Sequence, residues 1–304
     1  MKKLMKAALL ASAVLTVGVG QAETGKLLLT GGVSTIAGSA GGGLTPWAVI
    51  GTQATEGELG VSAHLTQVKT QDYQLNSAGV ALGVMERLEL SLARQDFDAS
   101  PAIALNGVAG QHLKMDVVGL KLKVAGDAVL DSDTLMPQIA VGLEYKSLKT
   151  GTFSPVLRSL GTQDSGTDFY ITATKLLLGK GLLLNATLRS TSANQNGLLG
   201  FGSAAPGRSR RSWQPEFSVA YLLSRHLAVG AEYRAKPNNL QALGAAAGLG
   251  DGLREESWKD LFVAWAPNKH FSLTAAYVDL GRVVPGITAG RRQTGYYLSG
   301  QIAY

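Results

Sequence analysis

Apolar residues recur at every second position over much of the chain, and this alternation predicts β-strands with one apolar face. Leu59, Val61, Ala63 and Leu65 alternate with small or polar residues in the first clear example. A helix would place apolar residues three and four positions apart, and these segments do not. The same period of two occurs at 139–146, 182–189, 227–234 and 271–277.

The connections between the expected strands alternate between short and long. Tight turns are expected at 85–87, 179–180, 224–225 and 267–269, and long connections at 99–111, 149–165, 193–212, 237–256 and 281–293. Segment 69–72 is short where the alternation calls for a long connection. Loops segregated by length onto two rims are typical of transmembrane β-barrels. A soluble sandwich has no reason to sort its loops in this way.

The predicted fold is therefore an all-β, antiparallel, up-and-down transmembrane β-barrel. Counting strands back from the C-terminus gives thirteen as far as 47–53. Because single-chain barrels of this type have an even number of strands, 26–35 is expected as the first, for a total of about 14. The alternative is 12 strands, with residues 23–55 folded inside or around the barrel.

The final strand runs to the last residue. Tyr296, Leu298, Gly300 and Ile302 alternate up to the terminal Tyr304. This resembles the C-terminal signal by which outer-membrane proteins engage the barrel assembly machinery, although an ordinary edge strand ending in Tyr is the alternative. An exposed apolar edge invites aggregation, and barrel closure removes it.

The N-terminus has the features of an export signal. Lys2, Lys3 and Lys6 precede an apolar stretch over 7–19, and Gly20-Gln21-Ala22 forms a small-x-small cleavage site. We expect a signal peptide at 1–22 and a mature barrel at 23–304, located in the outer membrane among lipid and lipopolysaccharide.

Composition narrows the function. The 304 residues include 38 Gly and no Cys, and only 16% are charged. The formal charge of +6 falls to +3 without the first 22 residues, which leaves 25 basic against 22 acidic side chains. That excess is too small for a nucleic-acid binder, and the lack of Cys excludes thiolate metal sites and disulfides. No cofactor, metal or catalytic residue is expected.

Charged residues on the polar face of a barrel strand must point into the lumen, because Arg or Lys facing lipid at mid-depth costs about 2–4 kcal/mol. The expected lumen residues can pair with one another or meet a solute. They are Glu58, His64, Glu144, Lys146, Arg189, Glu232 and Arg234.

Two further groups of residues are expected at the ends of the barrel. One comprises aromatic residues suited to interfacial girdles, namely Trp47, Trp213, Tyr233, Trp258, Tyr277 and Tyr304. The other comprises outer-loop arginines that either contact lipopolysaccharide phosphates or are simply solvated, namely Arg208, Arg210, Arg211, Arg291 and Arg292.

An enzymatic role has little support. His64 shares a strand face with Ser62 and Glu58, a combination that also occurs in Ser–His–acid hydrolases. Residues two apart lie on one face of any strand, so chance produces this set readily. Gly41-Gly42-Gly43 is not a phosphate-binding loop, because no Lys-Ser/Thr pair follows it.

Two segments resemble a known family. Residues 25–34 (GKLLLTGGVS) with 41–48 (GGGLTPWA) are similar to the opening of the proteobacterial family DUF3034, and 87–97 (RLELSLARQDF) is similar to a second segment of it. The resemblance implies an envelope protein but brings no activity or functional residue. We expect the Gly-rich stretch 31–43 to allow close backbone approach, as a lumen constriction or a bent first strand; a flexible terminal linker is the alternative.

The sequence thus predicts an outer-membrane barrel that serves as a passive pore or uptake channel for a small solute. Two alternatives remain open. One is a non-conducting structural or adhesion barrel that binds lipopolysaccharide or a partner through its outer loops. The other is a lipid-modifying barrel enzyme. The sequence leaves the oligomeric state undetermined.

Overall fold

The computed structural model describes residue 26 and residues 28–99, 112–129, 134–205 and 211–304. The expected signal peptide lies outside the described residues, as do Arg208 and Arg210. Among the residues described, no helix combines the length and the apolar character needed to cross a bilayer.

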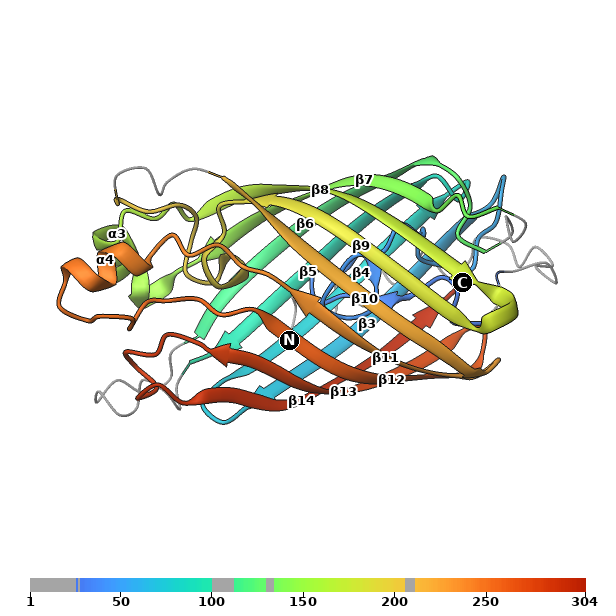
Figure 1. The fold of residues 1–304 in the computed structure, drawn as a ribbon. Helices are drawn as coiled ribbons and strands as arrows, with labels where there is room; N and C mark the ends of the chain where they lie inside the picture. The colour runs from blue at the N-terminus through green and yellow to red at the C-terminus, as the bar shows by residue number, and fades with distance from the viewer. Residues whose placement is uncertain (1–25, 27, 100–111, 130–133, 206–210) are drawn as a thin grey trace, which may run out of the picture.

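Within the described residues, twelve antiparallel strands form one closed barrel (Figure 1). Each strand pairs with its neighbours in sequence, and the last pairs with the first, so no strand edge is left open. The wall strands are β3 (Leu59–Thr70), β4 (Gln74–Val84), β5 (Leu88–Asp98), β6 (His112–Ala125), β7 (Gln138–Lys149), β8 (Ser165–Leu177), β9 (Leu182–Thr191), β10 (Ser212–Ser224), β11 (Leu227–Arg234), β12 (Trp258–Asn268), β13 (Phe271–Arg282) and β14 (Arg292–Ala303).

The expected count of about fourteen strands is wrong, and the alternative of twelve is confirmed. The segments expected as the first two strands, 26–35 and 47–53, are not part of the wall. The N-terminal segment instead runs inside the barrel (Figure 1) and contributes only the two-residue strands β1 (Val33–Ser34) and β2 (Ala40–Gly41). Every residue from Val33 to Thr52 is buried, whereas a wall strand would leave alternate side chains exposed. We call residues 33–52 the plug.

The two rims of the barrel differ, as the loop lengths predict. The rim we call the short-turn rim carries the connections that follow β4, β6, β8, β10 and β12. The opposite, long-loop rim carries the remaining connections, including the short turn between β3 and β4. Its loops contain η2 (Gly151–Phe153), α3 (Ser154–Ser159), η4 (Asn194–Gly197) and α4 (Gln241–Ala246), and η3 (Leu178–Lys180) lies in the β8–β9 turn. Figure 1 shows α3 and α4 together at the long-loop end.

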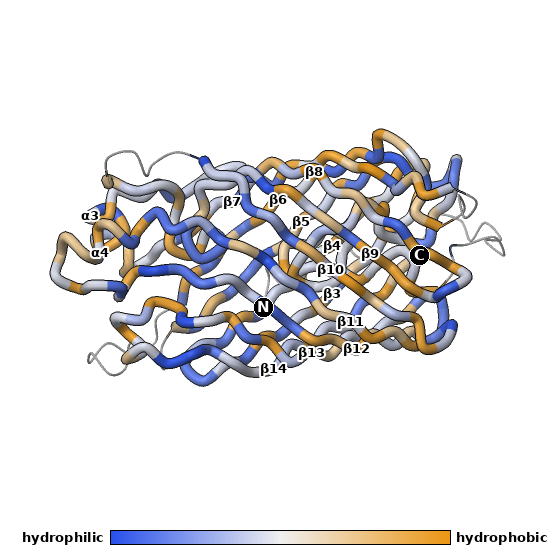
Figure 2. The backbone as a smooth tube through the Cα atoms, in the orientation of Figure 1, coloured by the Kyte–Doolittle hydropathy of each residue, from blue (hydrophilic) through white to orange (hydrophobic). Residues whose placement is uncertain are grey.

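The outer face is apolar over the part of the wall nearer the short-turn rim, and Figure 2 shows more hydrophobic residues along the strands toward that end. Exposed Leu and Val side chains cover this band, among them Leu65, Val80, Leu92 and Leu184. Exposed aromatic residues lie at its border toward the long-loop rim, where Phe217 stacks on Tyr233. Beyond that border the outward positions turn polar and charged, as at Lys69, Arg94, Lys114, Lys149 and Lys259. This layout is that of a membrane-spanning barrel whose strands extend past the bilayer on one side.

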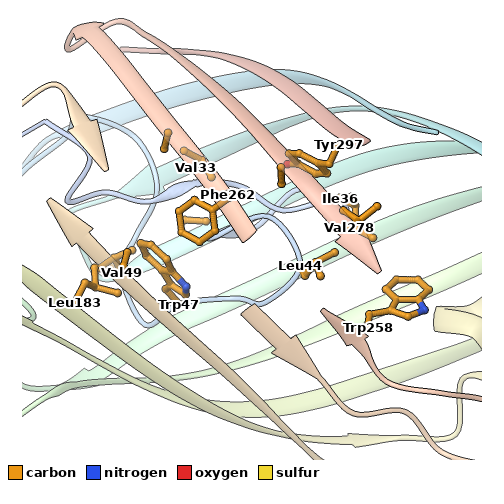
Figure 3. Packing of buried hydrophobic residues seen from close by; sticks show 14 of the residues in the cluster. Val33, Ile36, Leu44, Trp47, Val49, Leu183, Trp258, Phe262, Val278 and Tyr297 are labelled. Atoms are coloured by element: carbon orange, nitrogen blue, oxygen red, sulfur yellow. The ribbon is translucent and has the colours of Figure 1, made fainter. Parts of the chain in front are cut away.

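Two of the aromatic residues expected in the interfacial girdles lie elsewhere. Trp47 and Trp258 are buried in the interior, at 4% and 5% exposure, because Trp47 belongs to the plug and Trp258 to the inner face of β12. They form part of an apolar cluster between plug and wall (Figure 3), in which Ile36 and Leu44 of the plug also take part. The apolar inner face of β12 is explained by this contact with the plug.

The outer band leads to a first prediction. Val80 and Asn76 are exposed on the same face of β4, Val80 within the apolar band and Asn76 near its border. We expect Val80→Arg to lower the free energy of unfolding by about 2–4 kcal/mol, and Asn76→Arg by about 0–1 kcal/mol. Denaturant unfolding in lipid vesicles measures both values. Equal losses in the two variants would contradict a bilayer around Val80.

Candidate functional site

The plug has almost no sheet partners of its own, so its backbone polar groups bind side chains of the wall. Glu89 of β5 accepts hydrogen bonds from the amides of Ala40 (3.0 Å) and Gly51 (2.6 Å). Lys121 of β6 forms an ion pair with Glu89 (3.0 Å) and donates to the carbonyl oxygens of Ala40 and Trp47. Both charged side chains are 1% exposed, and their burial is offset by these contacts.

A second carboxylate holds the middle of the plug. Glu232 of β11 accepts hydrogen bonds from the backbone amides of Leu44 (2.8 Å) and Thr45 (3.1 Å) and from the Thr45 hydroxyl (2.5 Å). Ser218 of β10 also donates to Glu232. The single wall carboxylate of Glu232 therefore binds one turn of the plug through both its backbone and a side chain.

Polar uncharged residues of β7, β8 and β9, strands that lie between β6 and β11 in the wall, complete the attachment. The Pro46 carbonyl oxygen accepts hydrogen bonds from Thr172, Asn185 and Thr187, on strands β8 and β9. The same wall holds Ala48, whose amide donates to the Thr174 hydroxyl and whose carbonyl accepts from Gln138. Because buried backbone groups without partners are costly, these contacts determine where the plug lies.

Glycine is required where the plug meets Glu232. A Cβ atom on Gly42 would lie 2.5 Å from the Glu232 Oε1 atom, well inside van der Waals contact, and one on Gly41 would lie 2.0 Å from the Thr45 carbonyl oxygen. The Gly-rich segment thus allows backbone and carboxylate to approach closely.

The interior also contains a chain of alternating charges between the plug and the long-loop rim. Lys146 contacts Asp168 (2.7 Å) and Glu144 (3.2 Å), and Arg189 contacts Glu144 (2.9 Å) and Glu216 (2.6 Å). Arg234 continues the chain through Glu216 (3.2 Å) and donates to the Leu44 carbonyl of the plug. Three cations and three carboxylates from β7 to β11 therefore neutralise one another.

The loop between β9 and β10 enters the barrel and caps this chain of charges. Asn194–Gly197 is buried, and the Asn196 side-chain oxygen accepts hydrogen bonds from Lys146 (3.0 Å) and Arg234 (2.8 Å). Gln195 and Asn196 have positive φ angles of 45° and 60°, a conformation that costs energy and that these contacts stabilise. We call residues 193–205 the inner loop.

The inner loop is anchored to a buried acid–base pair in the β11–β12 connection. The Gln195 amide donates to Glu255 (2.8 Å), whose carboxylate lies 3.6 Å from the Lys236 Nζ atom. Burial raises the pKa of Glu255 to about 7, although Lys236 opposes the shift. Burial likewise lowers the pKa of Lys236 to about 8, against the attraction of Glu255, with Arg234 adding to the decrease.

The structure places most of the expected lumen residues in these contacts. Glu144, Lys146, Arg189, Glu232 and Arg234 all point inward, and each binds another charged group, the plug or the inner loop. They are paired within the molecule, which was one of the two alternatives the sequence left open.

The other two expected lumen residues lie apart from this group. His64 is buried inside the barrel, and its ring nitrogens have no hydrogen-bond partner in the described part of the chain. Glu58 immediately precedes β3 and accepts hydrogen bonds from the amide and hydroxyl of Thr55. Ser62, His64 and Glu58 therefore do not form a hydrogen-bonded triad. Within the described residues no group of three or more His, Asp and Glu side chains could hold a metal ion.

Sequence reasoning missed several interior charges, among them Glu89, Lys121, Asp168 and Glu216. The signal was available for two of them, because Glu89 stands between the outward Leu88 and Leu90, and Lys121 between Leu120 and Leu122. A charge in that position on a membrane strand must point inward. The inner-loop residue Asn196 carried no comparable signal, since nothing in its neighbourhood indicates that the loop turns inward.

The described outer-loop arginines already have partners within the chain. Arg291 pairs with Asp72 and Arg292 with Asp279, each at 2.5 Å. Arg211 donates to the Thr167 carbonyl and lies over the Phe169 ring at 4.9 Å. Their contact with lipopolysaccharide stays a prediction.

The class that this geometry defines is a closed antiparallel barrel with an occupied interior. The model of the family described as a protein of unknown function, DUF3034, matches residues 30–301. The chain therefore belongs to this family, as its motifs predict. No curated protein is similar to the chain in sequence.

Several solved structures resemble the chain in fold at very low sequence identity. The KdgM porin in complex with disordered oligogalacturonate is 9% identical, with a TM-score of 0.48, over 81% of this chain and 99% of that one. The NanC porin is 10% identical, with a TM-score of 0.46 and the same coverage. Outer membrane phospholipase A from Escherichia coli is 9% identical, with a TM-score of 0.40, over 81% and 92%. These matches include both porins and an enzyme, so they indicate no single function.

The contact between Gly42 and Glu232 gives a second prediction. We expect Gly42→Ala to displace the Glu232 carboxylate and to speed hydrogen exchange at the Leu44 and Thr45 amides at least tenfold. The matched control is Gly300→Ala on β14, where an added Cβ has no atom within 4 Å. Unchanged exchange in Gly42→Ala would show that Glu232 does not hold the plug.

The buried pair at the inner loop gives a third prediction. Glu255 binds its proton more tightly in the folded state, so its contribution to the free energy of unfolding decreases as pH rises from about 4.5, the ordinary value, to about 7. We expect Glu255→Gln to remove this decrease. Unfolding of the two proteins across pH 4–8 measures the difference, and parallel curves for both would contradict it.

Proposed function

We propose that the protein is an outer-membrane channel for passive uptake of a small solute, closed at rest by its own N-terminal plug. The observation that carries the proposal is that residues 33–52 fill the bore yet remain a separate segment, held by wall side chains. Apolar side chains around the outside of the closed barrel support an outer-membrane location.

The mode of attachment favours a movable plug over a permanent filling. The plug pairs its two short strands only with each other, and its polar contacts with the wall are individual hydrogen bonds to side chains such as Glu89 and Glu232. Each such bond contributes about 0.5–1.5 kcal/mol net, so the segment is held by many separable contacts whose sum keeps openings rare.

The direction of release follows from the chain path. Residues 53–58 connect the plug to β3, which begins at the short-turn rim. Long loops face the cell exterior in barrels of this type, so the short-turn rim faces the periplasm. The plug is thus tethered on the periplasmic side, and withdrawal toward that side would open a path along the interior charges of β7 to β11.

A non-conducting structural barrel is the second candidate. The apolar cluster between plug and wall favours it, because Trp47, Phe262 and Tyr297 are packed as in an ordinary protein core (Figure 3). Such packing resists opening, and only a measurement of conduction separates the two functions.

The deciding experiment is planar-bilayer recording of the purified, refolded mature protein. We expect rare, brief openings in the wild type and at least tenfold more open time in Glu232→Ala. The variant loses three hydrogen bonds to the plug, each worth about 1 kcal/mol, and 1.4 kcal/mol is a factor of ten.

Glu256→Ala is the matched control, because Glu256 pairs with Arg282 at the long-loop rim and does not touch the plug. Its open time should equal that of the wild type. If wild type and Glu232→Ala both give no conductance steps while remaining folded, the protein is not a channel.

A further inference from the structure

A second interior feature lies at the long-loop rim, where the plug, wall and loops enclose a cavity of about 150 Å³. Ile36 and Leu44 of the plug form part of its lining, as do Val278 of the wall, Leu157 of α3 and Leu198 of the inner loop. Figure 3 shows Ile36, Leu44, Val278 and Trp258 in the same part of the interior. The lining is almost wholly apolar.

This part of the barrel has the reverse polarity of a membrane barrel. Val68, Leu75 and Leu113 point inward and are buried, while the neighbouring Lys69 and Lys114 point outward. A wall outside the bilayer needs no apolar lumen, since water can fill it. Apolar lining with a polar exterior is instead the arrangement of soluble barrels that hold one small ligand.

The loops of the long-loop rim add further apolar side chains to this part of the barrel. Phe153, Leu157 and Leu160 from the β7–β8 connection and Val283 and Ile287 from the β13–β14 connection turn their side chains over the mouth. They cover the barrel end without filling it. A dry cavity of about 150 Å³ lined by aliphatic and aromatic side chains is large enough to take up benzene.

Polar side chains of the lining bond within the protein. Thr70 donates to Gln293, Tyr73 donates to the Val283 carbonyl, and the Gln195 side-chain oxygen accepts from Lys236. The Trp258 Nε1–H group has no acceptor among the described residues, but its nitrogen is covered by protein atoms and does not reach the open space of the cavity. The surface that a ligand can touch is therefore apolar.

We propose that this cavity binds a small apolar molecule about the size of one substituted benzene ring. This molecule would be the solute of the channel, so the inference rests on the proposed function. Because Ile36 and Leu44 belong to the plug, the bound molecule lies directly against the segment whose movement would let it pass.

The probe is 4-fluoroacetophenone, followed by ¹⁹F NMR with the folded protein in detergent. We expect a bound resonance, distinct from the micelle pool, that saturates at one molecule per barrel. Fluorobenzene, which has no carbonyl group, should bind comparably, because the accessible lining is almost wholly apolar.

Variants whose larger side chains fill the cavity serve as the control. Leu198→Trp and Leu157→Trp should each abolish the bound resonance, whereas Leu249→Trp, on an exposed loop position, should keep it. Heat-modifiable gel migration verifies that each variant is folded; if neither filling variant folds, Leu198→Ala should allow a larger probe, 4-fluorobutyrophenone, to bind. No saturable resonance in the wild type, or one unchanged by every cavity variant, would overturn the proposal.

Failure of the two proposals can be told apart. Saturable binding without any conductance would reject the channel and retain the cavity as a ligand site. Conductance without saturable binding would reject the ligand class and retain the channel.

Discussion

The structure depends on how the plug satisfies its buried backbone groups. A wall strand pairs with two neighbours, but residues 33–52 run through the barrel with almost no sheet partners. Wall side chains must replace the missing ladder, and Glu89, Lys121 and Glu232 do so at hydrogen-bond distance. The polar side chains inside this barrel therefore serve first of all to bind the plug. The same requirement explains why Gly42, without a side chain, stands where the Glu232 carboxylate must come close.

The barrel is built from two zones with opposite polarity. Toward the short turns, apolar side chains face outward and charged ones inward, as hydrocarbon surroundings demand. Toward the long loops, the outward positions are charged. The inward positions of β3 and β6, such as Val68 and Leu113, are apolar, whereas those of β7 to β11 carry the ion pairs. The boundary on the outer face shows where the bilayer ends. The interior beyond it has two sides, one based on ion pairs and one on apolar contacts around a cavity.

Local pattern predicted the wall well and the interior poorly. Period-two alternation located strands such as β3, β7 and β9, and loop lengths assigned the two rims. The strand count was wrong because 26–35 and 47–53 have enough apolar residues to resemble strands, while what excludes them from the wall, burial on all sides, depends on distant partners. Pairing of Arg189 with Glu216 and of Lys146 with Asn196 likewise joins strands and loops far apart in sequence, which no local periodicity encodes.

The contact between the two ends of the wall has a consequence for biogenesis. Tyr304 exchanges backbone hydrogen bonds with Val61 of β3, at 2.8 Å in both directions, only a few residues after the plug ends. The seam of the barrel thus joins its first strand, β3, to its last, β14. Once this seam closes, the plug has no lateral entrance left. The N-terminal segment must then enter either before the ring is sealed or afterwards through the short-turn end, where residues 53–58 tether it to β3.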